Sequence, residues 1–324
     1  MRPRIGFLGT GWIGRHRMDA MVATGAIEPA AFADPSPECA AQARACAPGA
    51  VQVDGLDALL ALGLDGIAIA TPSAMHAEQS IRALDAGVAV FCQKPLGRTA
   101  AEVDAVLAAA RRADRLLGVD LSYRHTAGMQ AIADLARSGA LGDVFAVDLL
   151  FHNAYGPDKP WFYDPVQSGG GCVIDLGVHL VDLALWTLGF PAVAGVTASL
   201  RAQGRPLGAE QVEDYATAAF RAGTADVRLA CSWRVHAGTD AEIAAVFYGT
   251  QGGAALRNVG GSFYDFVAER FTGTSKTVLA CPPDAWGGRA AAAWAEQLAR
   301  SPQFDPEAAH FARSAEVLDR IYGR

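Results

Sequence analysis

The sequence feature that most constrains the fold is a glycine pattern near the N-terminus, Gly9-Thr10-Gly11-Trp12-Ile13-Gly14. It follows the short apolar run 4–8 and opens a stretch of helical character that continues to about residue 24. In such a strand–turn–helix unit the first glycine permits a tight turn and the second lets the backbone approach a pyrophosphate. The third lets the helix pack closely on the strand, and the helix N-terminus faces the phosphates. The pattern therefore predicts a dinucleotide site.

An acidic residue at the expected distance supports this prediction. The next predicted strand, residues 29–33, ends at Asp34, which lies 20 residues after Gly14. In dinucleotide-binding units an acid at about that distance bonds the ribose 2′-hydroxyl. A carboxylate there would repel a 2′-phosphate, so the sequence favours NAD over NADP. The alternative is that Asp34 only begins the turn Asp-Pro-Ser-Pro.

Short strands continue to alternate with helices as far as residue 120. The expected strands are 66–70, 88–92 and 116–119, and the expected helices are 56–62, 73–84 and 99–112. This alternation predicts a doubly wound parallel sheet with helices on both faces, a Rossmann domain over residues 1–120. Ligands of such sheets bind at the carboxyl ends of the strands. We therefore assign to the cofactor site Gly9, Gly11, Trp12, Ile13, Gly14, Asp34, Thr71, Pro72, His76, Gln93, Lys94 and Pro95.

Lys94 stands out among these residues. It follows an apolar strand and precedes Pro95, whose peptide bond in the cis form would fix the direction of the lysine. An exposed lysine at a strand end is the simpler interpretation. Its place at the edge of the sheet that faces the cofactor favours a functional one.

A second feature is the stretch 169–186, GGGCVIDLGVHLVDLALW, in which three glycines lead into an apolar run. Its strongly polar side chains are Asp175, His179 and Asp182, and a spacing of four places the first two on one face of a helix. In a structural interpretation Asp175 satisfies amides of the first helical turn and His179 is a hydrogen-bonded core residue. In a functional one the carboxylate orients an imidazole that moves a proton. These residues alone leave both open, and Asp182 is interpreted as structural.

Composition narrows the class of protein. Hydrophobic residues make up 51% and charged residues 19% of the 324 residues, enough for the cores of two domains, 1–120 and 121–324. The net charge of −7 argues against a nucleic-acid or anionic-membrane partner. Six cysteines form no CxxC pair and no metal-like spacing with histidine, so we expect no metal and reduced thiols in the cytoplasm. No signal peptide is expected, and no uncharged apolar run reaches the roughly 18 residues of a membrane span.

The second domain is expected to be α+β, with a large, mostly antiparallel open sheet. Its expected strands are 143–151, 192–200, 215–221, 225–233 and 243–248, with helices at 127–138 and 306–322. Before the three glycines lies a loop, 152–168, rich in aromatic residues and prolines, which we expect to form a wall of the substrate pocket. His152 and Trp161 in or beside this loop, and Arg124 at the domain junction, are the candidate substrate contacts.

Four of these motifs in this order resemble the Gfo/Idh/MocA family of nicotinamide-dependent dehydrogenases of sugars, inositols and related polyols. They are GTGWIG, TPSAMHAE (71–78), CQKPLGRT (92–99) and the glycine-led helix 169–186. The family's Glu-Lys-Pro signature matches at Lys94 and Pro95, and its Asp-x-x-x-His signature matches at Asp175 and His179. The resemblance implies that Lys94, Asp175 and His179 form the catalytic constellation. The usual glutamate is Gln93 here, which changes the electrostatic environment of the lysine.

The resemblance also implies a homodimer or homotetramer that forms through the open face of the second sheet. The function we expect is hydride transfer between NAD and a secondary alcohol or ketone of a sugar, inositol or related polyol. His179 would act as general base, Asp175 would hold the imidazole, and Lys94 would stabilise charge on the reacting oxygen. Two alternatives stay open: reduction of a non-sugar small molecule on the same fold, and a regulatory protein that binds dinucleotide without turnover.

Overall fold

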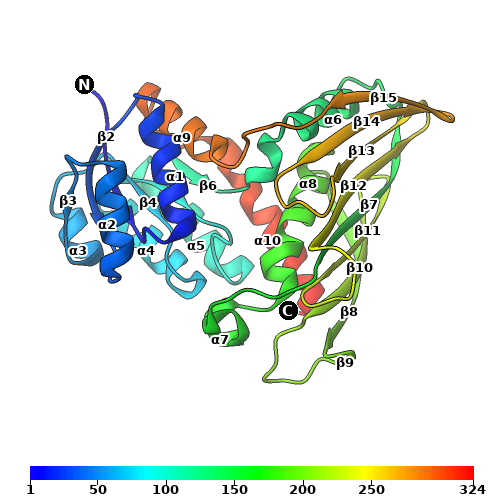
Figure 1. Ribbon diagram of the computed structural model, residues 1–324, viewed down its shortest axis with the longest axis horizontal. Coiled ribbons are helices and arrows are strands. Elements are labelled where there is room, and N and C mark those ends of the chain that lie inside the picture. The colour runs from blue at the N-terminus through cyan, green and yellow to red at the C-terminus, as the bar shows by residue number, and fades with distance from the viewer. The chain divides into compact units, whose positions relative to one another are not determined.

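A parallel sheet of six strands is the centre of the first of two structural units in the computed structural model, which describes all 324 residues (Figure 1). This unit comprises Met1–Ser122 and Gly288–Ala312. The strands lie in the order β3-β2-β1-β4-β5-β6. Their bounds are β1 Arg4–Leu8, β2 Glu28–Ala33, β3 Val51–Gln52, β4 Gly66–Ile69, β5 Ala89–Cys92 and β6 Leu117–Val119. This is the order of a Rossmann sheet, and it confirms the predicted doubly wound parallel sheet: successive strands are added on one side of β1 up to β3 and on its other side from β4 onward.

Six helices belong to this unit. They are α1 Trp12–Ala23, α2 Pro37–Cys46, α3 Gly55–Leu60, α4 Ser73–Asp85, α5 Ala100–Ala113 and α9 Arg289–Arg300. Side-chain caps begin two of them: the Thr99 hydroxyl accepts the amide of Glu102, and the Ser36 hydroxyl that of Cys39. The predicted helices lie within a few residues of the observed ones, whereas α2 and α9 were not predicted.

Helix α9 makes the domain division differ from the predicted one. All residues after 120 were assigned to the second domain, but Gly288–Ala312 belong to the first unit. Trp294 of α9 is buried and lies where a Cβ on Gly66 or Gly118 would come within 2.8 Å and 2.6 Å of its ring. The two strand glycines therefore make room for an indole that arrives from far along the sequence.

The second unit, Tyr123–Gly287 and Arg313–Arg324, contains a nine-stranded sheet in the order β15-β14-β13-β12-β7-β11-β10-β8-β9. The strands are β7 Val144–Asn153, β8 Val193–Ala202, β9 Arg205–Pro206, β10 Tyr215–Ala222, β11 Ala225–Ser232, β12 Ala241–Gly249, β13 Gly253–Asn258, β14 Phe266–Thr272 and β15 Ser275–Ala280. All neighbours pair antiparallel except β7 and β11, which are parallel. The fold class is thus confirmed.

Helices cover one face of this sheet. Helix α6 (Ala127–Arg137), helix α8 (Val178–Thr187) and the C-terminal part of α10 (His310–Tyr322) pack there and share one apolar core with the strands (Figure 1). Shorter elements are α7 Pro165–Ser168, a π-helical turn η3 Val173–Gly177, and 3₁₀ turns η1 Ser122–His125, η2 Pro160–Tyr163 and η4 Pro306–Ala309. The apolar stretch Pro165–Thr187 is long enough to span a membrane, but 94% of its most apolar window is buried inside the protein. Its second part, η3 followed by α8, is the central helix of this core.

Candidate functional site

The glycine-rich turn after β1 has the geometry of a pyrophosphate cradle. Gly9 has φ +82°, and a Cβ there would lie 2.6 Å from the carbonyl oxygen of Ala70. A Cβ on Gly14 would lie 2.2 Å from the carbonyl oxygen of Gly9, so α1 packs directly on the turn. At Gly11, by contrast, a Cβ would meet nothing within 4 Å. Since no side chain caps α1 and no acid lies in its first turn, its amides suit an anion, and the turn fits a dinucleotide.

Asp34 accepts two backbone hydrogen bonds, one of which is the bond that the turn interpretation expected. Its Oδ1 accepts the amide of Ser36 at 2.9 Å, as an acid at the start of a turn does. Its Oδ2 accepts the amide of Thr10 at 2.6 Å, inside the glycine-rich turn. An ionised carboxylate has about four acceptor positions, so two bonds leave capacity for a ribose hydroxyl. That contact stays a prediction.

The loops that follow β4 and β5 are joined by a buried histidine. His76 of α4 places Nδ1 2.7 Å from the carbonyl oxygen of Pro95 and Nε2 2.7 Å from that of Thr71. Burial lowers the pKa of His76, the two carbonyls act to raise it, and the nearby Lys94 charge lowers it again. Because both ring nitrogens are engaged, any part that His76 plays at the cofactor passes through these loops.

Lys94 lies between two such attachments. Its amide donates to Oε1 of Gln93 at 3.0 Å, and the next residue, Pro95, is held by His76 after a cis peptide bond. Among the other predicted cofactor residues, the Thr71 hydroxyl donates to Oε1 of Gln79 at 2.6 Å. The first unit thus collects the predicted cofactor residues, with Lys94, along one sheet edge.

In the second unit, a buried carboxylate that sequence reasoning missed organises the three glycines. Glu213, 1% exposed, accepts the amide of Gly171 at 3.0 Å, the amide of Val173 at 2.8 Å and the hydroxyl of Tyr322 at 2.8 Å. A Cβ on Gly171 would lie 2.0 Å from the Glu213 carbonyl oxygen, and one on Gly170 2.0 Å from the Tyr322 hydroxyl. Burial raises the pKa of Glu213, and these hydrogen bonds act to lower it. The glycines therefore allow a close approach to Glu213 and Tyr322. A single acid in a loop gives no sequence signal for this.

Asp175 and His179 come directly after the three glycines in the chain. Asp175 lies in the π-helical turn η3 and His179 in the first turn of α8, so the regular helix expected through both residues is widened at its start. The indole N–H of Trp233 donates to Asp175 Oδ2 at 3.1 Å. The His179 ring, in a residue 7% exposed, meets the Tyr123 ring edge-on with 4.8 Å between centroids. Burial raises the pKa of Tyr123, and the charge of Asp175 raises it further.

The π-helical turn matters because wide turns of this kind are frequent at functional sites. Around Asp175 and His179 the structure brings an indole donor and a buried phenol, set in the apolar core. This arrangement can orient an imidazole and keep a carboxylate hydrogen-bonded while most water is excluded.

The three candidate substrate contacts have partners within the second unit. Arg124 makes a bidentate pair with Asp182, with 2.6 Å from Nε to Oδ2, and its guanidinium lies 5.3 Å from the Phe190 ring centroid. Asp182 is thus a buried carboxylate whose charge is paired with that of the partly exposed Arg124. These contacts fix Arg124 in the helical layer, and its role toward substrate stays a prediction.

The other two candidates, His152 and Trp161, also contact side chains of the second unit. His152 Nδ1 lies 2.7 Å from the Ser232 hydroxyl, and burial lowers the pKa of His152 while Glu242 acts to raise it. Trp161 stacks on Phe162 with 3.8 Å between ring centroids.

The structure contains no group of three histidine, cysteine or acidic side chains that could hold a metal ion.

Comparison with known proteins places both halves of the chain in one family. Residues 3–121 match the model of an oxidoreductase family with an NAD-binding Rossmann fold, and residues 129–255 match the GFO/IDH/MocA C-terminal domain. A putative UDP-kanosamine synthase oxidoreductase subunit of Amycolatopsis mediterranei is 33% identical over 275 residues, 79% of this chain and 75% of that protein. The D-glucoside 3-dehydrogenase of Escherichia coli is 32% identical over 141 residues, 43% of this chain and 40% of that enzyme.

Solved structures share the fold along the full length. A 3-ketoreductase from Actinomadura kijaniata, in complex with NADP and TDP-benzene, has a TM-score of 0.84 at 23% identity and covers 100% of this chain and 98% of its own. Levoglucosan dehydrogenase in complex with NADH and levoglucosan has a TM-score of 0.82 at 22% identity and covers 100% and 97%. The predicted family, fold class and NAD-binding domain are confirmed. The chain belongs to the Gfo/Idh/MocA family of oxidoreductases.

Proposed function

We propose that this protein transfers hydride between NAD and a secondary alcohol or ketone carbon of a sugar, an inositol or a related polyol. The observation that carries the proposal is that Asp175 lies in a π-helical turn, His179 lies in the first turn of the helix that follows, and Trp233 donates to the carboxylate. Relatives support the substrate class by their names, which include glucoside 3-dehydrogenase and inositol 2-dehydrogenase.

The chain's own residues divide the work. Gly11 and the first turn of α1 bind the pyrophosphate, and Asp34 binds the ribose hydroxyls, which favours NAD over NADP. When bound, the nicotinamide supplies the site that accepts or donates hydride.

Proton transfer falls to the second unit. His179 takes the proton of the substrate hydroxyl in oxidation and returns it in reduction. Asp175 orients the imidazole and stabilises its protonated form, while the Trp233 indole keeps the carboxylate in place. Lys94 donates to the reacting oxygen and stabilises the negative charge that develops on it. His152, Trp161 and Arg124 remain candidates for binding the rest of the substrate.

A substrate panel tests the proposal. Purified protein with NAD, and separately with NADP, is mixed with inositols, aldoses, glycosides and anhydrosugars, and formation of reduced nicotinamide is followed by absorbance. We expect turnover with at least one of these classes and a preference for NAD. Turnover confined to non-sugar carbonyl compounds would support the non-sugar reductase instead. Tight dinucleotide binding without turnover on the whole panel would support the regulatory protein.

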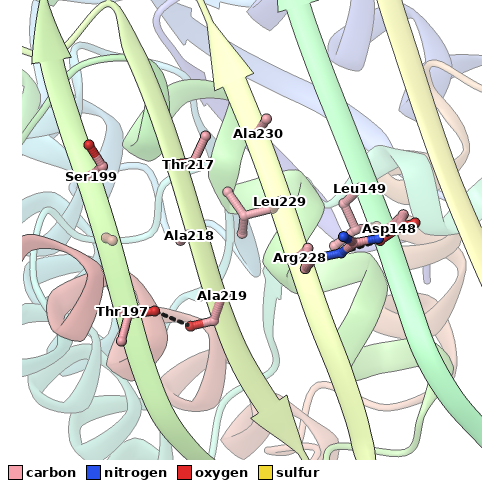
Figure 2. Close-up of a pocket in the computed structure, with 11 residues that line it drawn as sticks. Asp148, Leu149, Thr197, Ser199, Thr217, Ala218, Ala219, Arg228, Leu229 and Ala230 are labelled. Carbon is pink, nitrogen blue, oxygen red and sulfur yellow. Dashed lines mark hydrogen bonds and ion pairs between the residues drawn. The ribbon is translucent and has the colours of Figure 1, made fainter.

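We further propose that a second copy of the chain covers the open face of the nine-stranded sheet. This face carries a hollow of about 590 Å³ (Figure 2), lined by small side chains such as Ser199, Thr217 and Ala230. An ion pair between Arg228 and Asp148 lies at one side of it. A sheet whose other face is already packed on helices leaves such a surface to a partner. We expect a dimer or tetramer by light scattering, and Thr217→Glu, on the outward face of β10, should shift it toward monomer. A monomeric parent protein would contradict this.

The compartment we propose is the cytoplasm, because all six cysteines are free thiols. Cys172 and Cys231 lie 3.9 Å apart at their sulfurs in the core of the second unit. Fractionation of the native host tests this, and recovery of the protein outside the cytoplasm with a bond between these two thiols would contradict it.

A further inference from the structure

Three side chains near Lys94 form a hydrogen-bonded relay, in which Arg17 and Asp120 are buried and Gln93 is half-buried. Arg17 of α1 donates from Nε to Oδ2 of Asp120 at 2.6 Å, and Gln93 donates from Nε2 to the same oxygen at 2.8 Å. Gln93 in turn accepts the amide of Lys94 at its Oε1. We propose that Asp120, paired with Arg17, is a positioning residue that acts through Gln93 on Lys94. This inference rests on the proposed role of Lys94.

Burial makes the charge of Asp120 dependent on its hydrogen-bond donors. Asp120 is 1% exposed and Arg17 is 7% exposed, so the carboxylate depends on the guanidinium for charge compensation. The other carboxylate oxygen, Oδ1, has no hydrogen-bond partner in the protein. Loss of either donor to Oδ2 would therefore leave the buried carboxylate with too few hydrogen bonds. The two donors thus fix the position of the Asp120 side chain.

Donor and acceptor chemistry at Gln93 admits one orientation. Asp120 ionised only accepts hydrogen bonds, and the amide of Lys94 only donates. A side chain that bridges them has to donate at one end and accept at the other, which is what a carboxamide does. The amide nitrogen is thereby directed to Asp120 and the amide oxygen to Lys94, with no freedom to flip.

The relay links the glycine-rich helix to the lysine. Arg17 lies on α1, three residues after Gly14, while Asp120 and Gln93 follow the neighbouring strands β6 and β5. The amide of Asp120 also donates to the carbonyl of Cys92 at 2.9 Å, which fixes the two strand ends side by side. On the far side of Lys94, His76 holds Pro95. The peptide of Lys94 is therefore fixed from both directions.

The relay also gives a physical reason for glutamine at position 93. A glutamate there would bring a second carboxylate to the position now 2.8 Å from Asp120 Oδ2. A buried carboxylate and a half-buried one at that distance repel each other, so one would retain a proton to a higher pH because its pKa would rise. Glutamine supplies the donor permanently. With Asp120 in place, Gln93 thus adds no titratable group between Asp120 and the Lys94 amide.

Four variants test the inference. Gln93→Glu creates the carboxylate pair, and Gln93→Met removes both bridging bonds while it leaves the Arg17–Asp120 pair intact. The double variant Gln93→Glu/Asp120→Asn moves the single charge from 120 to 93. The matched control is Gln42→Glu, because Gln42 also donates to a carboxylate, Glu38, but on the exposed surface.

The primary measurement needs no substrate. The chain has three lysines, so the rate at which Lys94 is acetylated by a small anhydride can be compared with that of exposed Lys276 by mass spectrometry. We expect Gln93→Glu and Gln93→Met to change the Lys94/Lys276 ratio by about tenfold, the equivalent of one hydrogen bond to a charged group. In Gln93→Glu the change should grow as pH rises, because the shared proton is then lost. The double variant should return toward the parent ratio, and Gln42→Glu should keep it.

Thermal unfolding and steady-state kinetics complete the test. The melting temperature of Gln93→Glu should fall with rising pH relative to that of the parent. With a known substrate, the kcat of this variant should fall over the same pH range, with little change in KM for NAD. If Gln93→Glu and Gln93→Met keep the parent labelling ratio at every pH, the inference is overturned. If the ratio changes but no substrate class is turned over, the relay stands and the proposed function fails.

Discussion

Trp233 donates its indole N–H to Asp175 Oδ2 at 3.1 Å, which ties the start of the central helix to the end of strand β11. This bond holds the carboxylate beside the apolar core of the second unit. Its loss should therefore affect proton transfer more than it affects folding.

The first prediction follows from this bond. Trp233→Phe should lower kcat by about tenfold, because a hydrogen bond to a charged group contributes roughly 1.5–3 kcal/mol. KM for NAD should change little. The control is Trp294→Phe: Trp294 is equally buried, but its indole N–H has no partner. Equal kcat losses in the two variants would show that lost packing, and not the bond to Asp175, is responsible.

Lys94 carries the second prediction. Lys94→Met should reduce kcat by about 10²–10³, the usual effect of removing one donor from a developing oxyanion. Dinucleotide affinity, measured by fluorescence titration, should stay close to that of the parent. Lys276→Met, on an exposed strand, serves as control. Unchanged turnover in Lys94→Met would remove this lysine from the mechanism.

Asp34 gives a prediction about cofactor choice. Asp34→Ala removes the charge that repels a 2′-phosphate and also the acceptor for the Thr10 amide. We expect the ratio of kcat/KM for NAD over NADP to fall by about tenfold or more, with weaker binding of both cofactors. Asp34→Asn separates the two effects, because it removes the charge and keeps one acceptor. A preference for NAD that survives both substitutions would disprove the assignment.

Glu213 gives a pH-dependent prediction. Burial raises the pKa of this carboxyl in the folded protein. Stability from such a group is present below its unfolded pKa and is lost as pH rises through its folded pKa. The free energy of unfolding of the parent should therefore fall with rising pH relative to that of Glu213→Gln. Denaturant titrations at several pH values measure the difference, and Glu210→Gln, at an exposed position in the same loop, should show none. A difference that does not vary with pH would contradict the raised pKa.

The Rossmann half could be predicted closely from local patterns. Five of its six strands are short apolar runs that end at glycine, proline or a polar residue, and their predicted and observed bounds differ by a residue or two. The two-residue strand β3 was not predicted, because it has no such run. Helix α9 escaped prediction because its docking depends on Trp294 meeting Gly66 and Gly118, which lie far away in the sequence. For the same reason, the sequence did not predict that residues 288–312 return to the first unit.

The candidate site was predictable to a smaller extent. Asp175, His179 and Lys94 were identified by spacing, by strand position and by the family resemblance, and their catalytic roles remain predictions. Glu213, Asp120 and Arg17 were not identified, because each is one charged residue in an ordinary context. Their importance comes from burial and from partners that only the tertiary structure brings together.

The most direct test of the central claim compares parent protein and His179→Asn with NAD and the best substrate of the sugar and polyol panel across pH. The parent should form NADH, with a rate that declines at low pH as an imidazole base is protonated. His179→Asn should be slower by about 10²–10⁴, as expected for loss of a general base, and should lack that low-pH decline. Equal rates and equal pH profiles in the two proteins would contradict the account.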